Sequence, residues 1–467
     1  MGIFKAYDIR GVYGENLNEI DAFLVGYYTV KNFEFKSLKI GRDIRISSDN
    51  LTKYLMLGII EAKCKVIYEG LTSTPNFYYS LFDDIKDGIM ITASHNPKEY
   101  NGFKIMKDLL GVDRDTGLKD VEKLVNEDED NMKSKFEEIF EVYNEIDLDE
   151  FIEEFRNNGL LEIKDYKKDY LDYLYNFYDN LLTYEEKENL RSLKVGLDFS
   201  NGMTSLVLKD LAQKLEIDSY FFNDEPDGEF PNHSPDPFKA EDFIKNLNVN
   251  LDFYSCFDGD GDRVVFFDRN KEMIFPDYVI AVFIEFFLKN NYGDKFCYDL
   301  RVTKNIKDII EEYNAKGIES RVGRSFVSNI MRKEDCFFGG ELSGHLFFKD
   351  FNYLDNPDIA FIYFLKIISN LGENNDINSL IEPYKEKYCK LKEFNLEVAD
   401  RDGVLNKIYE NYKDNLISDM DGFSFDLGDV WFNVRKSNTE PILRFNLEGI
   451  NCSVVNKFKK ELNKFNI

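Results

Sequence analysis

The sequence contains few of the residues on which several protein chemistries depend. Its 467 residues include only three histidines, ten prolines and one tryptophan. The six cysteines, at positions 64, 256, 297, 336, 389 and 452, form no CxxC pair. Thiolate-held metals and dithiol redox chemistry are therefore disfavoured, and we expect reduced thiols in the core of a cytoplasmic protein.

Positive charge is also scarce. The chain has 59 Lys and Arg residues against 87 Asp and Glu residues, which gives a net charge of −28. A surface this acidic repels nucleic acids and anionic lipids, so neither is an expected partner. Residues 119–156 hold 15 acidic and 5 basic residues. Apolar residues at helical spacing, such as Phe136 and Phe140, predict a solvated helical excursion there, with an acidic interaction surface as the alternative.

No long apolar run is present. The first residues lack the apolar stretch of a signal peptide. The strongest run, residues 278–288, is interrupted by Glu285 and is shorter than the roughly 18–20 residues of a membrane span. This run therefore predicts a buried helix, and a membrane protein is not expected.

The chain does contain material for several cores, since 43% of its residues are hydrophobic and 15% are aromatic. Its length suggests two to four domains. Short apolar runs that end in polar loops occur at residues 38–40, 64–68, 88–92, 194–199, 252–257, 263–267 and 296–300. Helical patterns cover residues 49–63 and 305–313. This alternation predicts α/β units with mostly parallel sheets, whose ligands bind at the carboxyl ends of the strands.

The first loop that carries chemistry is TASHNP at residues 92–97. It follows a predicted strand and places the Ser94 hydroxyl beside the His95 imidazole, and Lys104 adds a cation ten residues after Ser94. A serine in this position is a candidate nucleophile or phosphate carrier. A simple turn or helix cap is the alternative.

The second loop, DGDGDR at residues 258–263, places three aspartates at alternate positions with glycines between them. Oxygen ligands of this kind select Mg²⁺, Mn²⁺ or Ca²⁺. An EF-hand is excluded, because its sixth and twelfth positions would be Arg263 and Arg269 instead of Gly and Glu. A magnesium loop with an adjacent arginine suits phosphoryl transfer, with an acidic surface turn as the alternative.

Two further polar segments lie nearer the carboxyl terminus. In GGELSGH, residues 339–345, an extended backbone would turn Glu341, Ser343 and His345 to one side, where a carboxylate and a hydroxyl can bind a sugar diol. RKSNTEP, residues 435–441, offers an arginine, small polar side chains and backbone amides to a phosphate, and it does not match a Walker A loop. Ordinary polar turns are the alternative for both segments.

Together these motifs resemble those of the α-D-phosphohexomutase superfamily, and specifically its phosphomannomutase/phosphoglucomutase branch. The resemblance begins with FKAYDIRG at residues 4–11 and GRD at residues 41–43, and continues through TASHNP and NGFK. It then includes DGEFPNHSPDP at residues 227–237, followed by DGDGDR, GGELSGH and RKSNTEP. All three histidines, His95, His233 and His345, fall within these motifs.

The resemblance implies interconversion of hexose 6-phosphate and hexose 1-phosphate. Ser94 would carry a phosphoryl group, pass it to the sugar to form a hexose 1,6-bisphosphate, and take back the other phosphate. Mg²⁺ would be held by phosphorylated Ser94 and by Asp258, Asp260 and Asp262. The other expected catalytic residues are Arg10, His95 and Lys104. The expected substrate-binding residues are Tyr7, Arg263, Arg301, Arg324, Glu341, Ser343, His345, Arg435, Ser437, Asn438 and Thr439.

The family architecture implies three related α/β domains with mixed sheets and a smaller C-terminal α+β domain similar to the TATA-binding protein. The positions of the motifs put the expected domains at residues 1–165, 166–271, 272–386 and 387–467. The resemblance also favours a monomer that acts on a small phosphosugar.

Two positions depart from the family pattern. Arg324 stands where relatives often have histidine, and Arg301 where lysine is common. Arginine does not act as a base near neutral pH, so Arg324 is expected to bind phosphate or stabilise charge. GELSGH and Asn438 favour mannose or glucose over glucosamine. The alternatives are a phosphoglucosamine mutase, a metal-dependent sugar phosphatase and a non-catalytic sugar-phosphate-binding protein.

Overall fold

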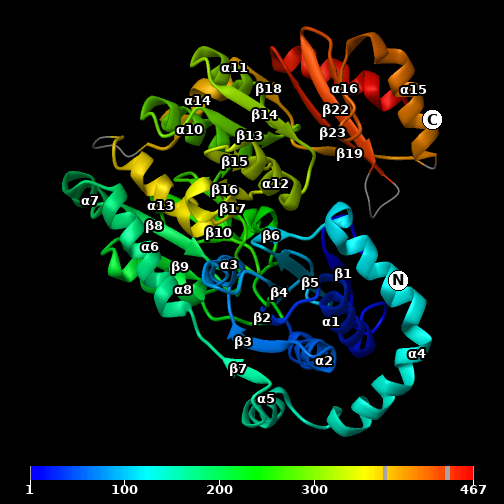
Figure 1. The fold of residues 1–467 in the computed structure, drawn as a ribbon. Helices are drawn as coiled ribbons and strands as arrows, with labels where there is room; N and C mark the ends of the chain where they lie inside the picture. The colour runs from blue at the N-terminus through cyan, green and yellow to red at the C-terminus, as the bar shows by residue number, and fades with distance from the viewer. Residues whose placement is uncertain (1, 372–375, 399, 437–441, 466–467) are drawn as a thin grey trace. The chain divides into compact units, whose positions relative to one another are not determined.

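The computed structural model describes residues 2–371, 376–398, 400–436 and 442–465. The chain divides into two compact units, one of residues 1–273 and 354–375 and the other of residues 274–353 and 376–467. Most strands belong to four β-sheets, each accompanied by helices (Figure 1).

The first sheet contains β1 to β7 in the order β1-β5-β4-β2-β3-β7, with β6 paired to β5. Its strands are Ile9–Val12, Ser37–Arg42, Lys65–Leu71, Gly88–Ile91, Tyr100–Lys107, Leu110–Gly111 and Leu161–Ile163. The first helices are α1 (Glu19–Phe33), α2 (Ser48–Glu61) and α3 (Thr74–Ser80). The predicted strands at 38–40, 64–68 and 88–92 and the predicted helix at 49–63 are confirmed within a few residues.

The second sheet has the order β12-β11-β10-β8-β9. Its strands β8 to β12 are Lys194–Asp198, Asp218–Phe222, Phe253–Phe257, Val264–Asp268 and Met273–Ile274. The helices of this region are α6 (Lys167–Leu181), α7 (Tyr184–Leu190), α8 (Ser205–Lys214), α9 (Glu241–Asn246) and, from later in the chain, α13 (Pro357–Ile368). Phe364 of α13 stacks on Phe266 of β11 with ring centroids 4.0 Å apart. Helix α13 thus shares the core of the first unit.

In the second unit, the third sheet runs β14-β13-β15-β16. These strands, β13 to β16 in chain order, are Lys295–Asp299, Lys316–Ser320, Phe338–Gly340 and Leu346–Phe348. The accompanying helices are α10 (Pro276–Lys289), α11 (Lys304–Glu312), α12 (Arg324–Glu334) and α14 (Asn378–Lys387). α10 contains the apolar run and is largely buried, as predicted. Among the described residues, no helix is both long enough and apolar enough to cross a membrane.

The three sheets share one plan. In each, three neighbouring strands are parallel and a fourth is antiparallel: β3-β2-β4-β5, β9-β8-β10-β11 and β14-β13-β15-β16. The sheets are therefore mixed, as the resemblance implied. The TASHNP, DGDGDR and GELSGH loops each connect the third parallel strand to the antiparallel strand. The fold repeats one loop position three times and gives each copy different chemistry.

The fourth sheet is antiparallel, in the order β18-β23-β22-β21-β20, with β19 paired to β23. Strands β18 to β23 are Cys389–Lys390, Phe394–Glu397, Leu416–Ser418, Phe423–Asp426, Val430–Lys436 and Ile442–Gly449. Helices α15 (Arg401–Tyr412) and α16 (Cys452–Leu462) complete this region. Tyr412, Phe425, Phe432 and Phe458 pack together in its core.

The acidic excursion is helical, as predicted. It forms α4 (Lys119–Tyr143) and α5 (Leu148–Asn157). Phe136 on α4 contacts the rings of Phe23 and Tyr54, with centroids 5.8 and 5.6 Å apart. The buried Lys53 ammonium donates to the carbonyl oxygens of Tyr143 and Ile146 at 2.8 and 2.6 Å, and so binds the carboxyl end of α4.

The cysteine prediction is correct for four residues and wrong for two. Cys64, Cys256, Cys297 and Cys336 are buried thiols. Cys389 and Cys452 instead form a disulfide, although 63 positions separate them in the sequence. Cys389 begins β18 and Cys452 begins α16, so the fold brings together two residues that sequence spacing does not connect.

Candidate active site

The TASHNP loop holds Ser94 in a strained and buried position. Ser94 follows β4 and has φ of 53°, in the left-handed region that non-glycine residues rarely adopt. Its backbone N–H donates to the Thr92 hydroxyl at 2.8 Å. Its own hydroxyl donates to Asp258 Oδ2 at 2.7 Å and lies 3.3 Å from His95 Nδ1. The predicted serine and aspartate loops therefore meet.

The backbone around Ser94 is fixed by Arg45, which the sequence analysis did not single out. The Arg45 guanidinium donates to the carbonyl oxygens of Ser94, Asn96 and Pro97 at 2.7, 2.8 and 2.7 Å. Asp43 accepts from Arg45 Nε at 3.0 Å. Because Arg45 is 1% exposed, its role is to position the serine loop from inside the protein.

The DGDGDR loop gathers three carboxylates. Asp258, Asp260 and Asp262 are fully buried, and one oxygen of each lies within 4.8 Å of the others. Burial, together with repulsion from Asp262 and Asp260, raises the pKa of Asp258 well above its ordinary value. Asp260 Oδ1 is buried and accepts no hydrogen bond from any described residue. The donor set and this unsatisfied oxygen fit a hard divalent cation.

Lys104 lies against the same carboxylates. Its ammonium donates to Asp260 at 2.5 Å and to Asp262 at 2.6 Å. Burial alone would lower the pKa of Lys104, but the two carboxylates raise it above its ordinary value. Lys104 is therefore a cation, and it is better suited to stabilising negative charge than to accepting a proton.

The other predicted residues of the first unit lie around this cluster. Arg10 donates to Asn96 Oδ1 at 2.9 Å and to Asp8 at 2.5 Å. Arg263 Nε is 3.8 Å from Asp258 and 3.7 Å from Asp262. Tyr7 is near enough to influence the pKa values of both Arg10 and Arg263. The structure thus brings together all the predicted residues from Tyr7 to Arg263.

The GELSGH segment differs from the extended backbone that was predicted. Residues 341–344 form a turn between β15 and β16, closed by a hydrogen bond from Gly344 N to the Glu341 carbonyl oxygen at 3.0 Å. The three side chains nevertheless gather. His345 Nδ1 lies 2.9 Å from Ser343 Oγ and 3.0 Å from Glu341 Oε2. The chain reversal, and not strand alternation, groups them.

The side chain of Arg301 is held by Asp299, the last residue of β13. Its Nε and one terminal nitrogen donate to the two oxygens of Asp299 at 3.0 and 2.7 Å. Asp299 also accepts from the backbone N–H of Leu342 at 2.8 Å, which ties Arg301 to the GELSGH turn. Arg324 is the first residue of α12 and is 5% exposed. Gly323, just before it, donates its N–H to Glu341 Oε1 at 2.7 Å.

Arg435 lies near the end of β22 and is 9% exposed. It is directly opposite Arg444 of β23. Burial and the positive charges of Arg301 and Arg444 lower the pKa of Arg435, while Glu393 opposes them. The remaining predicted residues of this loop, Ser437, Asn438 and Thr439, lie outside the described residues.

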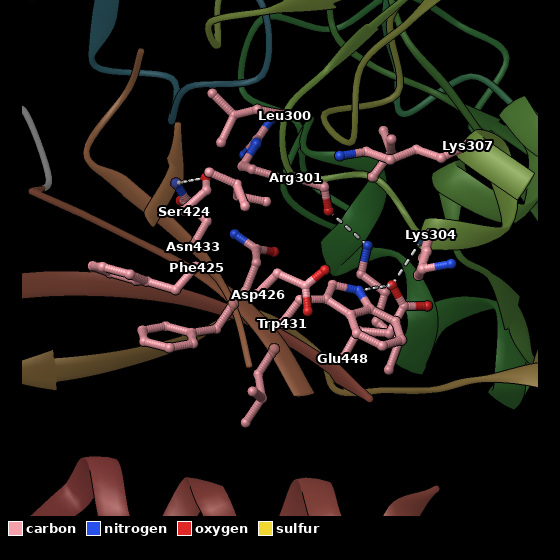
Figure 2. Close-up of a pocket in the computed structure, with 16 residues that line it drawn as sticks. Leu300, Arg301, Lys304, Lys307, Ser424, Phe425, Asp426, Trp431, Asn433 and Glu448 are labelled. Atoms are coloured by element: carbon pink, nitrogen blue, oxygen red, sulfur yellow. Dashed lines mark hydrogen bonds between the residues drawn. The ribbon is translucent and has the colours of Figure 1, made fainter. Parts of the chain in front are cut away.

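A cavity of about 80 Å³ adjoins Arg301 and is lined by the loop after β13 and by β21 to β23 (Figure 2). Beside it, the Glu448 carboxylate is 3% exposed. It accepts hydrogen bonds from Lys304 N and Trp431 Nε1, both at 2.8 Å (Figure 2). It also accepts from Thr303 Oγ1 at 2.5 Å. Glu448 thus joins the start of α11 to the fourth sheet and holds that sheet beside Arg301.

His233 does not belong to the serine cluster. Its Nε2 lies 2.9 Å from Asp198 Oδ2, and its Nδ1 lies 2.8 Å from the Ser234 carbonyl oxygen. The imidazole faces two acceptors, and it donates to both only when the ring is protonated. Burial opposes this charge, but Asp198 and the Ser234 carbonyl raise the pKa of His233.

Fold and geometry together define an α/β enzyme with a buried serine beside a carboxylate cluster that fits a divalent cation, and with a set of arginines in the second unit. Four domain models of the phosphoglucomutase/phosphomannomutase family match the chain. α/β/α domains I, II and III match residues 1–132, 168–271 and 275–388, and the C-terminal domain matches residues 388–464.

Curated relatives match over nearly the whole chain. A phosphomannomutase of Methanocaldococcus jannaschii is 36% identical over 96% of this chain and 93% of its own length. A phosphomannomutase of Vibrio cholerae is 30% identical over 99% and 97%. The chain therefore belongs to the phosphoglucomutase/phosphomannomutase family of hexose-phosphate mutases.

Solved structures agree on the fold. A family protein of Burkholderia thailandensis superimposes with a TM-score of 0.77 at 22% identity, over 99% of this chain and 96% of its own. A putative phosphomannomutase of Thermus thermophilus gives 0.77 at 17% identity, over 99% and 98%. The four-domain architecture that the resemblance implied is confirmed.

Proposed function

We propose that the protein interconverts hexose 6-phosphate and hexose 1-phosphate, with mannose or glucose as the sugar, through a phosphoserine at Ser94. The observation that carries this proposal is the position of the Ser94 hydroxyl, 2.7 Å from Asp258 in a buried loop held by Arg45. A serine fixed beside three carboxylates and the Lys104 cation is suited to carrying a phosphoryl group.

In the proposed reaction, a hydroxyl oxygen of the sugar phosphate attacks the phosphorus on Ser94. The bond from phosphorus to Ser94 Oγ breaks and a bond to the sugar oxygen forms. The sugar hydroxyl loses its proton, and Ser94 Oγ gains one and leaves as a free serine hydroxyl. Lys104, Arg10 and Arg263 stabilise the charge on the transferring group. The hexose 1,6-bisphosphate then turns and returns its other phosphate to Ser94.

The proposed cofactor is Mg²⁺, held by Asp258, Asp260 and Asp262 and by phosphorylated Ser94. When bound, it would withdraw charge from the phosphoryl oxygens. Asp258 Oδ1 accepts from the N–H groups of Asp262 and Arg263 at 2.9 and 3.1 Å, and Thr74 Oγ1 donates to Asp260 Oδ2 at 2.8 Å. These bonds orient the carboxylates before any cation arrives.

Residues of the second unit have the proposed role of recognising the substrate. Glu341, Ser343 and His345 form a polar group suited to sugar hydroxyls. Arg301, Arg324 and Arg435, with Ser437, Asn438 and Thr439, are proposed to bind the phosphate that is not being transferred. We also propose the domain limits 1–165, 166–271, 272–386 and 387–467, and a monomeric enzyme.

Mannose and glucose are proposed together because they differ only at C2. The resemblance implies that Glu341 and Ser343 bind the sugar at O3 and O4, and such contacts would not distinguish the two sugars. A phosphoglucosamine mutase is the nearest alternative, and a sugar phosphatase is more distant. Turnover of mannose, glucose and glucosamine phosphates by one preparation separates the mutases. Release of inorganic phosphate in step with sugar turnover would identify the phosphatase.

The decisive test is Ser94→Ala. We expect turnover to fall by about 10³-fold or more, since the phosphate carrier is lost. The intact mass of the purified protein should show one phosphate, and this phosphate should be absent from the variant. The control is Ser453→Ala, which changes an exposed serine on α16. Full turnover by Ser94→Ala would exclude the mechanism.

A further inference from the structure

One carboxylate in the second unit lies among three arginines. Glu393 immediately precedes β19, and its oxygens lie 3.7 Å from Arg301, 3.7 Å from Arg435 and 3.4 Å from Arg444. Asn446 Nδ2 also donates to Glu393 at 3.1 Å. We call Glu393 and these three arginines the guanidinium cluster.

The fold forces the cations of this cluster together. Arg435 and Arg444 are directly opposite each other on β22 and β23, a placement that destabilises a sheet unless an anion lies between the charges. Arg301 reaches the cluster from the end of β13, where Asp299 holds its planar group. Burial and the neighbouring positive charges lower the pKa of Arg435, so this site requires negative charge.

Glu393 supplies that charge only loosely. Its contacts with the arginines, at 3.4 to 3.7 Å, are longer than the roughly 2.7–2.9 Å of a charge-assisted hydrogen bond. Its side chain is 24% exposed, whereas the side chain of Arg435 is 11% exposed. Arg435 Nε is buried and has no hydrogen-bond partner among the described residues. Arg435 therefore retains a hydrogen-bond donor that the Glu393 carboxylate does not use.

We propose that Glu393 is a displaceable counterion, which neutralises the guanidinium cluster until the phosphate of the substrate enters and expels the carboxylate. A phosphate has more oxygens than a carboxylate and can bond to several arginines at once. The partly exposed Glu393 can turn into solvent, while the buried arginines stay in place. The identity of the entering anion rests on the proposed function.

This exchange has a consequence for turnover. The bisphosphate must release one phosphate from the cluster before it can turn and present the other. Competition from Glu393 weakens phosphate binding and so speeds that release. Glu393 is thus a positioning residue that sets phosphate affinity, and it transfers no group itself.

The test compares Glu393→Gln and Glu393→Asp with Glu397→Gln, which changes an exposed glutamate at the end of β19. The probe is inorganic phosphate. Its affinity is measured by calorimetry, and the thermal midpoint of unfolding is measured with and without it. We expect Glu393→Gln to bind phosphate about 3-fold to 10-fold more tightly than the parent. Its midpoint should be lower without phosphate but should rise further on addition. The phosphate affinity of Glu393→Asp should lie between those of the parent and Glu393→Gln. Glu397→Gln should bind phosphate and unfold as the parent does.

In turnover of glucose 1-phosphate, KM and kcat of Glu393→Gln should fall together by a similar factor. Weaker or unchanged phosphate binding by Glu393→Gln would overturn the inference, because a purely structural carboxylate gives that result. If the parent turns over no hexose phosphate while Glu393→Gln still binds phosphate more tightly, the proposed function fails and the counterion stands. If the parent turns over normally and the constants of the variant are unchanged, the proposed function stands and the counterion fails.

Discussion

The two charged groups of the molecule are built with opposite signs. Around Ser94, three buried aspartates are balanced by cations such as Lys104, and Asp260 Oδ1 has no hydrogen-bond partner among the described residues. In the guanidinium cluster, three arginines lie around the loosely held Glu393, and Asp299 also binds Arg301. Each group keeps one buried polar atom without a hydrogen-bond partner among the described residues, an oxygen of Asp260 in the first group and the Nε of Arg435 in the second. The comparison teaches that a chain of net charge −28 can still bind a phosphosugar, because local arrangement, and not net charge, determines the ligand.

Among the tests of this comparison, the largest expected effect comes from removing the Mg²⁺ that we propose for the aspartate cluster. Treatment with a chelator should reduce turnover by about 10²-fold to 10³-fold, and Mg²⁺ should restore it, because the phosphoryl charge is otherwise poorly neutralised. In a thermal melt, Mg²⁺ should raise the midpoint of the parent but not that of Asp260→Asn. Asp218→Asn, at an exposed position that begins β9, is the control. Full activity in the presence of the chelator would show that the aspartate cluster needs no bound cation for turnover.

A smaller effect is expected from Arg435→Lys in the guanidinium cluster. Lysine keeps the charge but loses the planar fork and the buried Nε. KM for the hexose phosphate should rise about 10-fold to 100-fold, and kcat should change less, because binding is lost more than transition-state stabilisation. The matched variant is Arg156→Lys, at an exposed position on α5. An unchanged KM would show that the phosphate binds elsewhere.

Short, ordered motifs made much of the architecture predictable from sequence. Strand–loop–helix patterns placed several of the strands of the first three sheets, because buried strands read as continuous apolar runs. The TASHNP and DGDGDR loops were predicted to act together, and Ser94 does meet Asp258. That contact joins positions far apart in the sequence, so only the resemblance, and no local pattern, connected them.

Other features could not be read from the sequence, for identifiable reasons. Arg45 looks like a surface arginine until its carbonyl partners are known. Glu393 belongs to no motif, and its meaning depends on β19 pairing beside Arg444. The Cys389–Cys452 disulfide depends on where β18 and α16 begin. In GELSGH the grouping of side chains was right but its geometric reason was wrong, because a turn replaces the extended backbone.

The smallest effect is expected at His233 and Asp198, a pair of opposite charges that lies outside both charged groups and serves as a contrast to them. His233 and Asp198 form an ion pair at 2.9 Å, with side chains 7% and 0% exposed, so this pair should respond to pH and not to added ions. The pKa of His233 is raised in the folded protein. Its stabilisation is therefore complete below the unfolded pKa of about 6.5 and is lost as the pH rises through the folded pKa. At high pH the neutral ring no longer donates to both Asp198 and Ser234.

His233→Asn should thus lower the thermal midpoint clearly at pH 6, for a loss of about 1–2 kcal/mol, and less at pH 9. Both differences should be the same with and without Mg²⁺ or phosphate. An equal loss at both pH values would mean that the ring acts by packing, and a loss that depends on either ion would place His233 in one of the two charged groups.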